Sequence, residues 1–182
     1  GLGTINPLGN SIEEYWDNLK NGVSDAGPIT RFDATHHKTR FACEVKNWDP
    51  LQHFDRKDAR KYDLYTQFGL VAAKQAILDS GIDLETIDKT RVGVIWGSGI
   101  GGLQTFDEEI RGLRSDNPKT SPFFIPKMIA NMASGCIGIE YGFRGPNFTT
   151  VTACASSANA IADALYYIRL GKADVVVSGG SE

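Results

Sequence analysis

The apolar and polar residues of this chain alternate between short apolar runs and longer amphipathic segments. Three runs are apolar enough for buried strands: residues 91–97 (RVGVIWG), 147–153 (NFTTVTA) and 173–180 (ADVVVSGG). Strands without polar alternation, separated by helices, are typical of a sheet that is covered on both faces. The pattern therefore predicts an α/β fold.

The remaining segments contain apolar residues at helical spacing. Ser11 and Glu14 form a capping box before the first helix, which Gly22 ends. The longest expected helix covers residues 55–81, with apolar side chains at Leu64, Phe68, Val71, Ala72 and Leu78. We expect the other elements as helices at 102–116, 127–142 and 154–171, a proline-containing loop at 117–126 and a short strand at 40–45.

Composition narrows the possible functions. The chain has 182 residues, 41% of them hydrophobic, and a net charge of −3. It has enough apolar residues for a packed core and no basic excess to attract nucleic acid or a membrane. No apolar run reaches the ~20 residues of a membrane span, and no signal peptide is visible. Three widely separated cysteines predict no disulfide framework, which fits the cytoplasm. We expect one domain, residues 1–182, that is incomplete at both ends.

A glycine-rich segment, WGSGIGG, follows the strand at 91–97 and precedes a helix. Gly97, Gly99 and Gly102 match the spacing of a dinucleotide-binding loop. However, the expected acidic residue at the end of a second strand is missing, and the following helix carries Asp107 and neighbouring glutamates. We therefore favour glycines that allow close packing beside the sheet over a cofactor site.

The histidines and two of the cysteines offer little chemistry. His36 and His37 are adjacent in a polar loop, and His53 precedes a charged helix, so we expect all three at the surface. None has metal-ligand spacing to a cysteine or carboxylate. Cys43 and Cys136 lie in apolar contexts, and we expect both to be small buried hydrophobic side chains.

Cys154 has a different setting, in the segment TVTACASSANA. A strand turns into a helix at this residue, so the sulfur is expected near N–H groups that stabilise a thiolate. The small residues around it leave room for a sharp turn and for a substrate. The same arrangement presents the nucleophile of α/β hydrolases, and the Cys154 N–H could contribute to an oxyanion hole. Position alone leaves a structural cysteine and a nucleophile both open.

An ordered set of motifs runs along almost the whole chain: PLGN, ITRFD, RKDARKYDLYTQFGLVAAKQAILDSG, GSGIGG, SPFFIPKMIANM, YGFRGPN and TACASS. With them the chain resembles the β-ketoacyl-acyl carrier protein synthases of the thiolase fold, and within these the elongating KAS I/II type, KAS II most of all. The resemblance implies the N-terminal half of a layered α/β/α/β/α fold, with a mixed sheet covered by helices.

The resemblance also implies an activity, that of a 3-oxoacyl-[acyl-carrier-protein] synthase of fatty acid biosynthesis. Cys154 matches the cysteine that takes an acyl group from acyl carrier protein as a thioester. Malonyl carrier protein then loses carbon dioxide, and its carbanion attacks that thioester, which extends the chain by two carbons. The family is homodimeric and needs no metal or organic cofactor, since phosphopantetheine of the carrier protein holds the substrates.

Other residues take roles from the same resemblance. Ile100 and Phe124 match positions that line the acyl-chain tunnel, the phenylalanine reaching across from the partner subunit. The basic residues of the expected carrier-protein docking patch are Lys57, Arg60, Lys61 and Lys119. A solvated helix face is the simpler interpretation of these charges, but like charges four residues apart repel, which favours docking.

The chain departs from the family in one important respect. The family's catalytic histidines, a lysine and a gating phenylalanine lie in a C-terminal half whose motifs are absent here. We therefore expect no condensation by this piece alone, and apolar faces and sheet edges left exposed. The alternatives are a polyketide ketosynthase, a fragment that only binds and dimerises, and an NAD-binding module. Cys154 argues against the second, because chain-length-factor subunits typically lack this nucleophile.

Overall fold

The computed structural model describes residues 1–182. Its helices are α1 (Ile12–Lys20), α2 (Arg56–Lys61), α3 (Leu64–Ser80), α4 (Leu103–Leu113), α5 (Phe124–Met128), α6 (Met132–Tyr141) and α7 (Ser156–Arg169), with short 3₁₀ turns η1 (Pro50–Gln52) and η2 (Lys89–Arg91). Its strands are β1 (Ala26–Pro28), β2 (Phe41–Cys43), β3 (Val92–Gly97), β4 (Asn147–Thr150) and β5 (Val175–Gly180). The alternation of strands and helices confirms the predicted α/β class.

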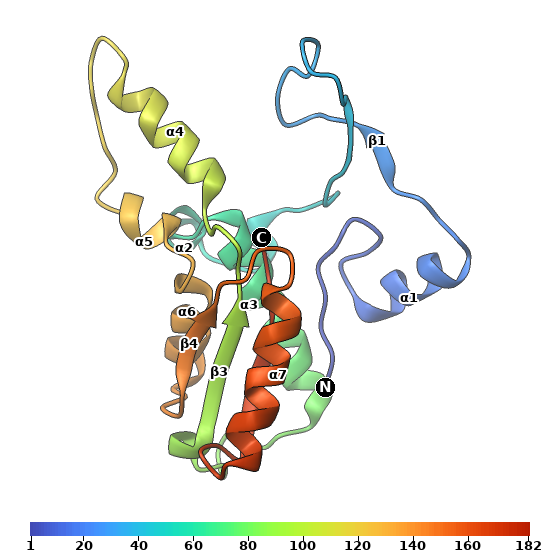
Figure 1. Ribbon diagram of the computed structural model, residues 1–182, viewed down its shortest axis with the longest axis vertical. Helices are drawn as coiled ribbons and strands as arrows, with labels where there is room; N and C mark the ends of the chain where they lie inside the picture. The colour runs from blue at the N-terminus through green and yellow to red at the C-terminus, as the bar shows by residue number, and fades with distance from the viewer.

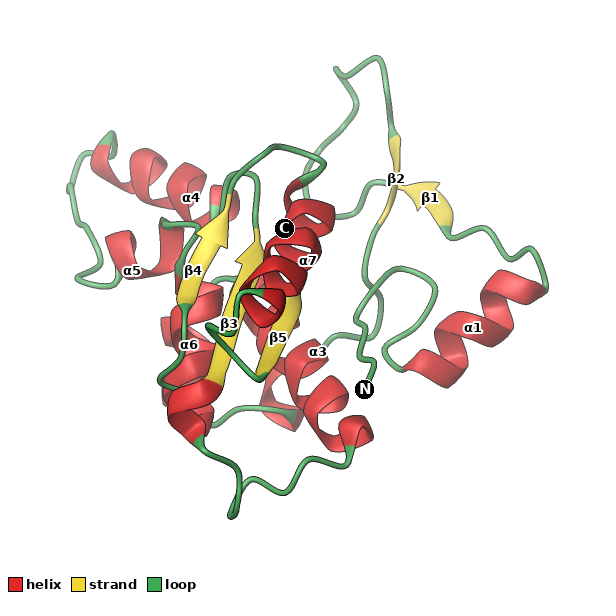
Figure 2. Ribbon diagram, turned by 60° about the horizontal axis from the view of Figure 1, so that its bottom comes forward, coloured by secondary structure: helices red, strands yellow, loops and turns green.

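A three-stranded parallel sheet in the order β4-β3-β5 forms the centre of the molecule. Helix α7 covers one face, while α3 and α6 cover the other (Figures 1 and 2). Every residue of β3 is buried, as expected for the middle strand of a sheet with helices on both sides.

Alternate residues of β3 belong to different cores, because successive side chains of a strand point to opposite faces. Val94 and Trp96 pack with residues of α3 and α6, such as Ile137, in the larger cluster. Ile95 faces the other way and packs with Ala160 and Ala164 of α7. The short side chains of α7 let this helix lie close to the sheet.

The first part of the chain forms an arm beside this layered body. Strands β1 and β2 pair antiparallel with each other only, and α1 precedes them. In Figure 1 the arm extends to one side of the sheet. In place of the single mixed sheet expected from the resemblance, the structure has two separate sheets, one parallel and one antiparallel.

The longest predicted helix, residues 55–81, is in fact two helices. Tyr62 is extended, and Asp63 caps α3 by accepting a hydrogen bond from the N–H group of Tyr65. The apolar side chains at helical spacing in this segment range from buried to exposed, with Leu64, Phe68 and Ala72 half-buried. Of the five side chains named for it only Val71 is buried, and Leu78 is 71% exposed.

The segment 117–142 also differs from the prediction. Helix α5 begins within the expected loop and ends at Met128, inside the expected helix at 127–142, and the second helix, α6, begins only at Met132. Ile129 is extended between the two, and its carbonyl group accepts a hydrogen bond from the Tyr65 hydroxyl. A contact with a residue distant in sequence thus stabilises the break.

Three local expectations can be compared with the structure. Ser11 caps α1 as predicted, but the Glu14 carboxylate accepts from the N–H group of Asn10 rather than that of Ser11. Cys136 is buried as expected, whereas Cys43 is exposed, because β2 pairs only with β1 and no helix covers it. The outer face of α7 exposes large apolar side chains, among them Ile161 and Leu165, as expected.

No helix of the chain combines the length and the apolarity that crossing a bilayer requires.

Candidate active site

Cys154 lies in a tight turn, residues 151–155, between the end of β4 and the start of α7. Ala153, the residue before it, has a φ of 51°. A residue with a Cβ adopts this left-handed conformation at a cost of roughly 1–2 kcal/mol. Backbone strain of this kind persists only where surrounding contacts impose it. The turn is therefore a sharp elbow, as the sequence predicted.

Side chains from the first turn of α7 hold this elbow. The buried Ser156 hydroxyl accepts a hydrogen bond from the Thr152 N–H group at 2.8 Å and donates to the Ala153 carbonyl at 2.6 Å. Asn159 donates from its side-chain amide to the Thr152 hydroxyl at 2.8 Å. The backbone around Cys154 is thus fixed without using the thiol.

The thiol itself is exposed, and its own N–H group has no acceptor in the chain. The N–H groups of Ser157 and Ala158, in the first turn of α7, are also without an acceptor. Free N–H groups at a helix start favour negative charge. The site can therefore stabilise an oxyanion that forms on a carbonyl group beside it.

Cys154 opens into a pocket of about 510 Å³ at the carboxyl ends of all three parallel strands. Ligand sites in open α/β sheets commonly occupy this edge. The pocket is lined by Gly97, Ser98, Gly99, Ile100, Ala153, Cys154, Ser156, Ser157, Gly180, Ser181 and Glu182. The structure thus brings together Ile100 and Cys154, two residues that the sequence analysis singled out separately.

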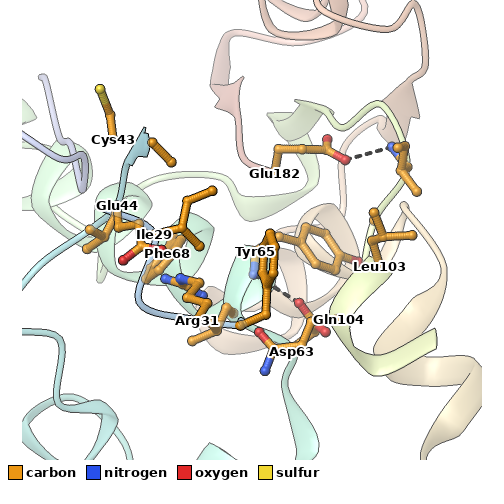
Figure 3. Close-up of a pocket in the computed structure, with 16 residues that line it drawn as sticks. Ile29, Arg31, Cys43, Glu44, Asp63, Tyr65, Phe68, Leu103, Gln104 and Glu182 are labelled. Atoms are coloured by element: carbon orange, nitrogen blue, oxygen red, sulfur yellow. Dashed lines mark hydrogen bonds between the residues drawn. The ribbon is translucent and has the colours of Figure 1, made fainter. Parts of the chain in front are cut away.

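The glycine-rich loop after β3 is held by Glu182. Its carboxylate accepts hydrogen bonds from the N–H groups of Gly99 and Ile100 at 2.6 and 2.9 Å, and from the Ser98 hydroxyl at 3.2 Å. Figure 3 shows this carboxylate facing the loop backbone. Because a carboxylate already occupies these N–H groups, the loop does not offer them to a phosphate, which disfavours the dinucleotide interpretation.

The glycines of this loop permit close packing, as predicted. Gly101 has a φ of 85°, and a Cβ there would collide with the Met128 carbonyl oxygen. A Cβ on Gly97 would lie 2.5 Å from the Ser156 carbonyl oxygen. The end of β3 and the start of α7 can meet beside Cys154 only because this strand position has no side chain.

We expect Gly97→Ala to destabilise the protein by about 1–3 kcal/mol, because the added methyl group meets backbone that must move. The displaced backbone belongs to Ser156, so the elbow should shift as well. Urea unfolding measures the first effect, and the alkylation rate of Cys154 measures the second. Gly135→Ala in α6 is the matched control, since a Cβ there meets nothing within 4 Å. An equal loss in both variants would contradict the packing argument.

A second pocket, of about 450 Å³, also borders Ile100. Figure 3 shows the side chains that line it. Ile100 and Glu182 line both pockets. Most of the other lining is apolar and comes from the β1–β2 arm and from the starts of α3 and α4, including Ile29, Phe32, Ala42, Val45, Leu64, Phe68 and Leu103. Ile100, whose side chain is 61% exposed, is therefore the shared wall between the cysteine pocket and an apolar pocket.

Phe124 does not line the cysteine pocket of its own chain. It is the first residue of α5 and is half-buried against Phe106 of α4, with ring centroids 6.3 Å apart. The expected action of this side chain on a partner subunit remains a prediction.

Three of the four predicted docking cations share helix α2. Lys57 and Arg60 are exposed and form no ion pair, whereas Lys61 pairs with Asp58 one turn earlier at 2.6 Å. Lys119 is exposed in the segment between α4 and α5. Lys119 also forms no ion pair, so Lys57, Arg60 and Lys119 are the uncompensated part of the patch.

The histidines are exposed, as predicted, and none lines the cysteine pocket. His53 stacks on Trp48 with ring centroids 4.9 Å apart. Partial burial, together with the charge of Lys74, holds the pKa of His53 below its ordinary value. No histidine of this chain is placed to exchange a proton with Cys154.

Two carboxylates beside these pockets, Glu182 and Asp63, were not expected from the sequence. Glu182 lies two residues beyond the end of β5, and an acidic residue just beyond an apolar strand is a detectable signal. Asp63 gave a weaker signal, because a capping residue in the middle of a helical pattern looks like an ordinary surface position.

The chain matches the family described as "Beta-ketoacyl synthase, N-terminal domain" over residues 1–182. It is 44% identical to a 3-oxoacyl-[acyl-carrier-protein] synthase 2 of Synechocystis sp., covering 100% of this chain and 44% of that protein. It is 40% identical to the Staphylococcus aureus protein of the same name, covering 100% of this chain and 45% of that protein. This chain thus spans less than half the length of either relative.

A solved structure, "The ishigamide ketosynthase/chain length factor", superimposes with a TM-score of 0.88 at 27% identity. The superposition covers 100% of this chain and 46% of that one. It confirms the thiolase-like fold that the sequence predicted. On the match of its whole length to the family description, the chain belongs to the β-ketoacyl synthase family, as part of the N-terminal domain.

Proposed function

We propose that this chain carries the acyl-accepting half of a 3-oxoacyl-[acyl-carrier-protein] synthase of fatty acid biosynthesis, with Cys154 as the nucleophile. The observation that carries the proposal is the elbow. An exposed thiol follows a strained residue at the start of a helix and beside a free N–H group, and it opens into a pocket that Ile100 walls. The names of the two curated relatives support this substrate class.

The first half-reaction follows from this geometry. The Cys154 thiolate attacks the carbonyl carbon of an acyl thioester, and the new oxyanion accepts a hydrogen bond from the Cys154 N–H group. When the tetrahedral intermediate collapses, the carbon–sulfur bond to the pantetheine breaks, and the pantetheine sulfur leaves as a thiolate that takes up a proton from water. The acyl group remains on Cys154, with its alkyl chain directed past Ile100.

In the second half-reaction, malonyl carrier protein loses carbon dioxide and its carbanion attacks the Cys154 thioester. The product is a β-ketoacyl chain two carbons longer, and Cys154 returns to the thiolate. We assign no residue of this chain to the decarboxylation, since its histidines lie away from the pocket. Neither half-reaction as written needs a metal or an organic cofactor.

The proposal extends to partners and location. The exposed cations of α2 suit an acidic acyl carrier protein. Phe124, which does not reach the cysteine pocket of its own chain, suits a homodimer in which it completes the pocket of the partner. The widely spaced, unpaired cysteines suit the cytoplasm.

We expect the double variant Lys57→Glu, Arg60→Glu to bind acyl carrier protein about tenfold more weakly at low salt, because two attractions become repulsions. Titration of labelled carrier protein at low and high salt measures this, and the difference should shrink at high salt. Lys172→Glu is the control, since this exposed lysine follows α7 at the opposite end of the sheet from Cys154. An equal loss in the control would mean that net charge alone is responsible.

The experiment that tests the proposed function uses acyl carrier protein loaded with a saturated acyl chain. After incubation, mass spectrometry of the peptide containing Cys154 should show the mass of the acyl group as a thioester that hydroxylamine releases. Acylation of another residue, or tight binding of NAD without acylation, would overturn the proposal. A carrier loaded with a poly-β-keto chain tests the polyketide alternative, and preferential transfer of that chain would favour it.

A further inference from the structure

Asp63 is a buried carboxylate to which the proposed reaction assigns no role. It lies between α2 and α3 with 7% of its surface exposed. One carboxylate oxygen accepts a hydrogen bond from the N–H group of Tyr65, in the first turn of α3, at 3.3 Å. The other accepts from both the N–H group (3.2 Å) and the hydroxyl group of Thr105, in the first turn of α4. A single side chain thus caps two helices.

Helix α4 depends on this distant cap because it has none of its own. Gly102 stands at its N-cap position and offers no side-chain oxygen. The first N–H groups of a helix need an acceptor, and a carboxylate at a helix start is stabilising. Asp63 is therefore the side-chain cap of α4, supplied from 42 residues away in the sequence.

The glycine loop reflects the position of this carboxylate. A Cβ on Gly102 would lie 2.9 Å from the Asp63 carboxylate and 2.5 Å from the Lys127 carbonyl oxygen. The loop between β3 and α4 is consequently held at two points, by Glu182 at Gly99 and Ile100 and by Asp63 at the start of α4. Ile100 is one of the residues that Glu182 holds, and Leu103 is the first residue of α4. Both line the apolar pocket.

Asp63 also connects this loop to helix α2. Only Tyr62 separates it from the last residue of that helix. The buried Gln67 of α3 donates hydrogen bonds from its side-chain amide to the carbonyl groups of Ala59 and Tyr62, both at 3.1 Å. Helix α2 is thus tied to the start of α3, where Asp63 reaches α4.

We propose that Asp63 is a positioning residue for acyl-chain binding: its carboxylate holds the start of α4 so that Ile100 and Leu103 form the apolar wall beside Cys154. The same contact ties this wall to helix α2, on which the carrier protein is proposed to dock. This inference rests on the proposed function, because it assumes that the pocket receives an acyl chain.

The test compares two alkylating reagents of different length, iodoacetamide and N-dodecyl iodoacetamide. Both react when the Cys154 sulfur displaces iodide from carbon, and the thiol proton goes to the solvent. The two reagents differ in the dodecyl chain, which can bind the apolar wall beside Cys154 before the sulfur reacts. Mass spectrometry of the Cys154 peptide gives both rates, and their ratio reports on the wall independently of the reactivity of the thiol.

The wild-type protein should favour the dodecyl reagent. Asp63→Ala should lower the ratio of dodecyl to short-reagent rates about tenfold, the factor that loss of one charge-assisted hydrogen bond commonly produces. Asp63→Asn, which keeps one carbonyl oxygen, should lower this ratio less. Thr105→Val should lower the ratio as well, and combining it with Asp63→Ala should cause no further loss. The rate with iodoacetamide itself should stay within about twofold of the wild type.

Asp88→Asn is the matched control. Asp88 also accepts hydrogen bonds from the N–H and hydroxyl groups of one threonine, Thr90, but it is exposed and remote from the pocket. The ratio of dodecyl to short-reagent rates should not change in Asp88→Asn. If both rates in Asp63→Ala fall together with the unfolding midpoint, Asp63 is only structural and the inference is wrong. If the wild-type protein shows no preference for the dodecyl reagent, the proposed acyl pocket itself fails, and the inference fails with it.

Discussion

The Cys154→Ala variant should form no acyl thioester when it is incubated with acyl carrier protein carrying an acyl chain. The reaction needs a nucleophilic sulfur at the elbow, and no other side chain of the pocket can replace it. Cys136 does not compete, because it is buried and its burial raises the pKa of the thiol to about 11, so that very little thiolate is present near neutral pH. We therefore expect the mass-spectrometric signal of the acylated protein to fall to background.

The matched control is Cys43→Ala, which removes the other exposed cysteine. This variant should still form the thioester at Cys154, because Cys43 lies in β2 and borders the apolar pocket without lining the pocket of Cys154. Both substitutions affect exposed side chains, so each should change the free energy of unfolding by less than about 0.5 kcal/mol. Acylation that persists in Cys154→Ala and disappears in Cys43→Ala would place the nucleophile on the arm and refute our assignment.

The largest expected loss of stability is that of Ile137→Ala. Ile137 is in the middle of α6, fully buried in the cluster that joins this helix to α3 and β3. Removing its outer carbons leaves a cavity in the core under the sheet, which typically costs about 2–5 kcal/mol. Urea unfolding followed by circular dichroism should show the lower midpoint.

Ile139→Ala provides an internal comparison on the same helix. Ile139 is 82% exposed, so the same chemical change should alter the free energy of unfolding by no more than about 0.5 kcal/mol. Similar losses in the two variants would mean that α6 does not pack on the sheet as described. A large loss of stability in Ile139→Ala alone would mean that the face of α6 that carries Ile139 is the buried one.

The strands and the elbow could be predicted from the sequence because their signals are local. A continuous apolar run such as residues 91–97 is stable only when it is buried, so β3 was expected in the middle of a covered sheet. The change from strand to helix around Cys154 placed the thiol at a turn, and the structure confirms that placement. The ordered motifs from PLGN to TACASS gave the family, which the match over residues 1–182 confirms.

The helix boundaries were less predictable, because partners far along the chain decide them. Residues 55–81 have a helical pattern throughout, yet the helix is interrupted where Asp63 reaches Thr105. The segment after Met128 is interrupted where Tyr65 reaches the carbonyl of Ile129. No local pattern contains these partners. The apolar context of Cys43 was misleading for a related reason, since burial needs a covering element and β2 has none.

The sequence by itself thus determined the α/β class, the family and the elbow that presents Cys154, because each can be recognised from runs or motifs of consecutive residues. Only the tertiary structure decided what surrounds that cysteine. It brought Ile100 into the same pocket, placed the Glu182 carboxylate on the glycine loop, and used Asp63 to cap α3 and α4 together. The contacts of Glu182 with the glycine loop and of Asp63 with Thr105 join residues 82 and 42 positions apart, and only folding around the parallel sheet brings such residues together.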